Sequence, residues 1–152
     1  MNKSFFIFII VVLGVFCLGI VFAGASFLSY VDLASFFIVI VVTAALLVST
    51  FKFREIGSYF KAAFNGSHAE PSTVKAGIVF FAAMQRYLIL SAVVANLIGL
   101  IAILSTLGEP KQIGLGLALS LLTIFYAVIF ILVLALPFRT SLERKLAEAG
   151  KS

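Results

Sequence analysis

Four long apolar runs alternate with short polar segments along the chain. The uncharged runs cover residues 5–25, 33–50, 87–107 and 113–136. Each has close to the roughly 20 residues that an α-helix needs to cross a bilayer. The second run is rich in β-branched residues, but a lone strand cannot pair its backbone in lipid, so a helix is expected there too. The pattern therefore predicts four transmembrane helices.

The third and fourth runs form a hairpin, because the polar segment 108–112 between them is too short for anything but an antiparallel connection. Pro137 is expected to end the fourth run, and a short charged helix follows it. Small residues on both runs supply surfaces for close helix packing. They are Ala92, Ala95, Gly99, Ala102, Gly114, Gly116 and Ala118.

The segment 51–86 between the second and third runs is amphipathic. One helical face of its first part carries Phe53, Ile56, Phe60 and Phe64. Asn65 and Gly66 end that helix, and Pro71 begins the next, which continues into the third run. A helix of about 35 residues is about 50 Å long, more than the thickness of a membrane. We therefore expect 51–86 to form a short stalk of two antiparallel helices outside the bilayer.

Composition agrees with a membrane protein built as one module. Of the 152 residues 63% are hydrophobic, and the mean hydropathy is +1.25. The single cysteine, Cys17, lies in an apolar run, so no intrachain disulfide or Cys/His metal site is expected. No nucleophile–base set or phosphate loop is present, so we predict neither an enzyme nor a cofactor.

The charges predict the orientation. Of the 11 basic residues, Lys111 lies between the third and fourth runs and the other ten lie on the opposite side of the predicted membrane. The positive-inside rule then puts both termini and the stalk in the cytoplasm. The net charge of +5 is explained by this bias and does not indicate nucleic-acid binding. A signal peptide cleaved near Gly24 is the alternative reading of the first run.

Polar side chains within the hairpin are the candidates for function. Asn96, Ser120 and Thr123 could line an ion path by offering an amide or oxygen atoms to a hydrated ion. Ile124 and Tyr126, on the same run as Thr123, are the other two candidate positions along this path. The alternative is that they form hydrogen bonds between helices, worth about 0.6 kcal/mol each on average. Asn96 is the most costly to bury and is the strongest candidate. Asp32 precedes the second run, where it either caps the helix or binds an ion.

The hairpin resembles the last two spans of the MotA branch of the MotA/TolQ/ExbB family. The resemblance lies in residues 95–101, in 108–118, in 121–126, which ends at Tyr126, and in Pro137. Residues 28–39 also resemble the approach to the second span of that family. It implies a homopentamer in the bacterial inner membrane, driven by protons or sodium ions. A single-span partner of the MotB/ExbD type would pass through the pentamer and supply the membrane aspartate.

Three departures from the family pattern bear on function. The large cytoplasmic domain is reduced to the stalk, Asn96 replaces a threonine of the third span, and Ile124 replaces the second threonine of the fourth. In the family that second threonine lies beside the partner's aspartate. Two hypotheses follow: an ion-conducting subunit of an energy-transducing complex, or a scaffold of the same architecture that does not conduct.

The topology can be tested by cysteine labelling in a Cys17→Ser background. Cysteines introduced at Ser29 and Gln112 should react with an impermeant reagent added from outside. Cysteines at Ser67 and Ser152 should react only from the cytoplasmic side, because their segments carry the basic residues. Labelling at position 67 from outside would contradict the orientation.

Overall fold

The computed structural model of the protein describes residues 3–24, 26–65, 69–105 and 110–150, and all of its elements are helices. In chain order they are α1 (Lys3–Phe22), the 3₁₀ turn η1 (Phe27–Tyr30), α2 (Leu33–Thr50), α3 (Phe53–Asn65), α4 (Pro71–Leu104), α5 (Pro110–Phe130), the π-helical turn η2 (Ile131–Ala135) and α6 (Leu136–Ala149).

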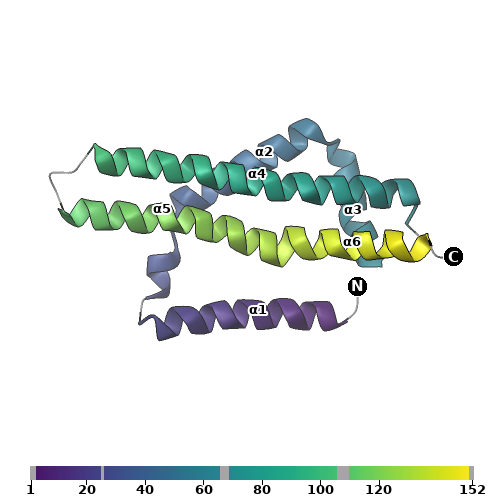
Figure 1. The fold of residues 1–152 in the computed structure, drawn as a ribbon, viewed down its shortest axis with the longest axis horizontal. Helices are drawn as coiled ribbons and strands as arrows, with labels where there is room; N and C mark the ends of the chain where they lie inside the picture. Colours follow the sequence, from purple (N-terminus) through teal and green to yellow (C-terminus); the bar gives the residue numbers. More distant parts are fainter. Residues whose placement is uncertain (1–2, 25, 66–68, 106–109, 151–152) are drawn as a thin grey trace.

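Two long antiparallel helical segments form the body of the molecule. One is α4, and the other is the continuous run of α5, η2 and α6 (Figure 1). The α2 helix packs against α4 and α5, while α3 turns away from α2 and crosses α4 and α6. This crossing differs from the antiparallel stalk that the sequence predicts.

Among the described residues, three helices are long and apolar enough to cross a membrane. They lie within Phe27–Thr50, Pro71–Leu104 and Ile113–Ala149. The chain is thus an all-helical protein with the apolar helices of a membrane protein. The first apolar run is described as a shorter apolar helix over Ile7–Phe22, so its membrane crossing stays a prediction.

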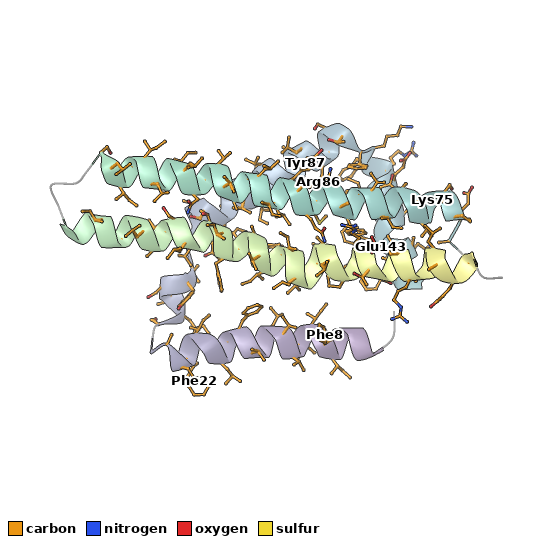
Figure 2. The ribbon with its side chains drawn as sticks, viewed as in Figure 1. Phe8, Phe22, Lys75, Arg86, Tyr87 and Glu143 are labelled. Atoms are coloured by element: carbon orange, nitrogen blue, oxygen red, sulfur yellow. The ribbon has the colours of Figure 1, made fainter. Side chains whose placement is uncertain are left out.

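The α1 helix packs less against the other helices than any other long helix does. None of its described side chains is buried, and Phe8 and Phe22 project from a helix that runs apart from the others (Figure 2). It contacts the body through the edge-to-face packing of Phe16 on Phe125, whose ring centroids are 6.3 Å apart. An apolar helix without a buried side chain among its described residues suits a lipid environment.

Several helix ends follow local sequence signals. The Asp32 carboxylate accepts hydrogen bonds from the backbone N–H groups of Ala34 and Ser35, at 3.3 and 2.9 Å, and so caps α2. This confirms the capping role predicted for Asp32. The predicted end of α3 at Asn65 and the start of α4 at Pro71 are confirmed as well.

Pro137 does not end the last helix as predicted. The helix continues to Ala149, and the turn before the proline widens: the Leu136 N–H bonds to the Ile131 carbonyl, five residues back. A proline lacks an N–H, and its ring collides with the carbonyl four residues earlier in a regular α-helix. The π-helical turn relieves this conflict and lets α5 run into α6.

Seven aromatic rings hold α3 in place. They come from Phe51, Tyr59, Phe60, Phe64, Phe80, Phe81 and Phe138, and most of their contacts are edge-to-face. We call this group the aromatic cluster. Phe80 and Phe81 of α4 are fully buried in it.

Side chains of α6 donate hydrogen bonds to the last backbone carbonyl groups of α3. Lys145 Nζ donates to the carbonyls of Ala62 and Ala63, at 2.9 and 2.7 Å, and Ser141 Oγ donates to Ala63 O at 3.2 Å. These carbonyls belong to the last turn of α3, which has no further helical N–H groups to pair with. The crossing of α3 over α6 is therefore held by polar contacts as well as by ring packing.

Candidate functional site: the polar contacts of the α4–α5 hairpin

Two glycines let α4 and α5 approach closely. A Cβ atom added at Gly99 would lie 2.5 Å from Ser120 Oγ, and one added at Gly116 would collide with the side chain of Ile103. Helices in a bilayer associate mainly through such close packing and through hydrogen bonds, because lipid gives little hydrophobic drive. Of the small residues identified in the sequence, Gly99 and Gly116 are thus used at this contact, whereas Ala102, Gly114 and Ala118 are exposed.

Three of the predicted site residues meet at one backbone carbonyl. Asn96 Nδ2 donates to Ser120 O at 2.8 Å, and Thr123 Oγ1 donates to the same oxygen at 2.7 Å. Ser120 and Thr123 are each only 3% exposed. We call Asn96, Ser120 and Thr123 the hairpin cluster.

The Ser120 hydroxyl itself has no hydrogen-bond partner within the described part of the chain, although it is buried. An unpaired buried hydroxyl costs about 1–3 kcal/mol. The hairpin cluster therefore has one unsatisfied polar group, next to an amide and a carbonyl that are paired. Such a group could accept or donate a hydrogen bond to a polar ligand if α4 and α5 moved apart.

Tyr126 lies in a different set of contacts. Its hydroxyl donates to the Tyr30 carbonyl at 2.6 Å and accepts from the Asp32 N–H at 2.8 Å. It thereby ties α5 to the segment that joins η1 to α2. The two bonds go to the last residue of η1 and to the residue before α2, so the structure uses Tyr126 to hold this connection.

Ile124 is 41% exposed, and it follows Ser120 by four residues, so it lies beside the hairpin cluster on the exposed edge of that face of α5. It shares its helical face with other large apolar residues spaced four, three and four apart, and all are exposed: Leu117, Leu121, Ile124 and Val128. We call this set the α5 seam. Thr123, one residue earlier, is buried within the chain, so the two neighbours serve different faces of α5.

A further buried pair was missed by the sequence analysis. Thr43 Oγ1 of α2 donates to Ser91 Oγ of α4 at 3.3 Å, and both residues are buried. Two hydroxyl residues in separate apolar runs are the only signal for such a pair, and their spacing does not reveal that they meet. The pair links α2 to α4.

The described residues include no group of three or more His, Cys, Asp and Glu side chains that could hold a metal ion. Asp32, the acidic residue before α2, has both carboxylate oxygens engaged in capping. This geometry favours the capping role over ion binding. His68, the single histidine of the sequence, lies outside the described residues.

No protein-family model matches the chain, and no curated protein matches it. The resemblance to the MotA/TolQ/ExbB family therefore depends on the residues of the hairpin and of the approach to α2.

The role of Tyr126 can be tested by Tyr126→Phe, which removes the hydroxyl and both of its bonds. We expect the free energy of unfolding in detergent to fall by about 1–2 kcal/mol, because membrane hydrogen bonds are individually modest. Circular dichroism during thermal unfolding measures the change. The control is Tyr87→Phe, which removes one contact, at 3.2 Å, with the exposed Thr50. Equal losses in the two variants would contradict a special role for Tyr126.

Proposed function

We propose that this chain is a subunit of an ion-driven, energy-transducing complex of the MotA/TolQ/ExbB type in the bacterial inner membrane. Five copies surround the membrane helix of a MotB/ExbD-like partner, which supplies the ion-carrying aspartate. Residues 5–25 provide a fourth span, and both termini face the cytoplasm. The observation that carries the proposal is the hairpin cluster, with its buried and unpaired Ser120 hydroxyl.

The need for a partner's carboxylate is supported by the chain itself. Its predicted spans contain no Asp, Glu, Lys or Arg. A carboxylate inside the membrane is expensive and is the usual mark of an ion path. An ion-driven complex built from this chain must therefore take its membrane acid from another protein.

The α5 seam supports assembly. Its four apolar residues follow the four-three-four spacing by which one helix packs against another. The seam borders the buried face of α5 that carries Ser120 and Thr123, and its own four residues are exposed. It thus offers a continuous surface for a neighbouring copy or for the partner's helix.

The hairpin cluster would serve as the polar element beside that surface. Asn96 and Ser120 together bring an amide, a carbonyl and an unpaired hydroxyl to one level of the hairpin. Groups of this kind can replace part of an ion's hydration shell. Because the cluster is enclosed between α4 and α5, ion passage requires the two helices to separate at Gly99.

A second candidate function is a scaffold of the same architecture that does not conduct. Two observations favour it. The donors of Asn96 and Thr123 are already paired with the Ser120 carbonyl, and Ile124 puts an apolar side chain on the seam where the family has a threonine. In this case the cluster stabilises the hairpin, and the seam only holds neighbouring helices.

A pair of substitutions separates the two functions. If the complex moves ions, Asn96→Leu should abolish ion flux into vesicles that contain the chain and its partner, and Ile124→Thr should preserve or raise it. The reason is that Asn96 then supplies the polar group that Ile124 lacks. Ser91→Ala is the control, since it removes a buried hydroxyl of the same helix from the Thr43 contact and should leave flux intact.

The outcome is decisive in either direction. Normal assembly and a normal partner-dependent phenotype for both variants identify the scaffold. Unchanged flux in Asn96→Leu, where the wild type clearly conducts, refutes the role of Asn96 in the path.

The oligomeric state is a separate prediction. Native mass spectrometry in mild detergent should show pentamers. Leu121→Ser, which places a hydroxyl at the most exposed position of the α5 seam, should lower the pentamer fraction. Ile101→Ser on α4, equally exposed but outside the seam, is the matched control. Finding only monomers or dimers for the wild type would count against the pentamer.

A further inference from the structure

The apolar runs of three helices end near one level of the molecule, and α3 lies just beyond it. Thr50, the last residue of α2, has its hydroxyl 3.2 Å from that of Tyr87 on α4. On the neighbouring side, Arg139 of α6 donates to Gln85 Oε1 of α4 at 3.2 Å. The last uncharged residues of these helices are thus held together, and the headgroup layer of a bilayer begins here.

The α3 helix crosses the bundle at this level (Figure 1). Lys75 and Glu143, labelled in Figure 2, mark the half of the molecule that carries α3 and α6 and extends beyond the apolar runs. The rings of Phe60 and Phe138 are 5.3 Å apart, and Phe138 immediately precedes the first charged residue of the last helix. The crossing point is therefore adjacent to the membrane surface.

Contacts with α6 determine which edge of α3 faces the bilayer. Phe60 and Phe64 pack on Phe138, whereas the carbonyls of Ala62 and Ala63 receive Lys145, which lies farther along α6 from the membrane. The Phe60 edge is thus the bilayer side. Phe53 is seven residues before Phe60, so it lies on the same edge, and it is 76% exposed.

The outward surface of α3 is basic. Arg54 and Lys61 are seven residues apart, lie on one stripe and are exposed. Lys52, just before the helix, has a side chain that is 84% exposed even though it lies 3.7 Å from Glu55. This surface combines an exposed aromatic residue on the bilayer side with cations beside it, the pattern of helices that lie in a membrane interface.

We propose that α3 is a membrane-surface anchor that binds anionic lipid headgroups. Lys52, Arg54 and Lys61 contact the headgroup phosphates of the adjacent leaflet, and Phe53 inserts between the lipids at the level of the glycerol backbone. The inner face of α3 stays packed in the aromatic cluster, so the anchor is rigid. It fixes the depth and tilt of the bundle through the contacts of α3 with α4 and α6.

The depth of Phe53 can be measured with Phe53→Trp in the full chain, since the protein contains no other tryptophan. In vesicles of phosphatidylcholine and phosphatidylglycerol, its fluorescence should be blue-shifted and quenched by lipids brominated near the start of the acyl chain. Ser58→Trp, on a different side of α3 and exposed, is the control and should be quenched mainly by aqueous acrylamide. Equal acrylamide quenching at both positions would overturn the proposal. A blue-shifted Phe53→Trp that brominated lipid does not quench would also overturn it, because a protein contact then covers the site.

The preference for anionic lipid can be measured with spin-labelled phosphatidylglycerol and phosphatidylcholine at low salt. Arg54→Gln/Lys61→Gln should lower the preference for phosphatidylglycerol at least about fivefold, the value of one basic side chain near an anionic surface. Lys75→Gln/Arg144→Gln removes the same charge from exposed sites on α4 and α6 and should leave the preference near that of the wild type. An equal fall in both pairs, or no fall in either, would refute specific binding at α3.

Discussion

The close approach of α4 and α5 at Gly99 and Gly116 is the contact on which one half of the molecule depends. This is the half formed by the long apolar runs, and we call it the membrane half. Lipid chains are as apolar as leucine, so these helices cannot be held together by apolar burial alone. The glycines remove the side chains that would keep the backbones apart. The distance that results lets Asn96 reach the Ser120 carbonyl across the interface.

The other half of the molecule is held by different forces. Beyond the apolar runs, the aromatic cluster packs α3 across α4 and α6 by burying its rings against both helices. The π-helical turn before Pro137 joins the two halves without breaking the long helix. The same two long helical segments thus carry the tightly packed α4–α5 hairpin at one end and the aromatic crossing of α3 at the other. The packing changes from one kind to the other near Arg139.

Polar groups in the membrane half serve mainly to define how the helices fit together. Tyr126 ties α5 to the connection before α2, and Thr43 with Ser91 ties α2 to α4. Each pairs a group that would be costly to leave unpaired in lipid. The Ser120 hydroxyl is the exception, and this is why the hairpin cluster, rather than Tyr126, is the basis of the functional proposal.

Helix positions could be predicted because the bilayer imposes a strong one-dimensional rule. An uncharged run of the right length, bounded by Asp32 and Thr50, becomes α2 with those ends. Pro71 likewise starts α4 as expected. Pro137 was predicted wrongly because proline ends a regular helix, whereas its i−4 conflict can also be relieved by a π-helical turn that no local pattern reveals.

The sequence by itself determined the helices, the separation of charges and the residues able to do chemistry. Only the tertiary structure decided what those residues contact: that Thr123 and Asn96 share one carbonyl, that Ile124 lies on an exposed seam, and that α3 crosses the bundle. The physical reason is the distance along the chain over which each effect acts. Hydropathy and capping act within a few turns of helix, whereas the rotation of each helix and its partners is set by packing between residues that are distant in the chain.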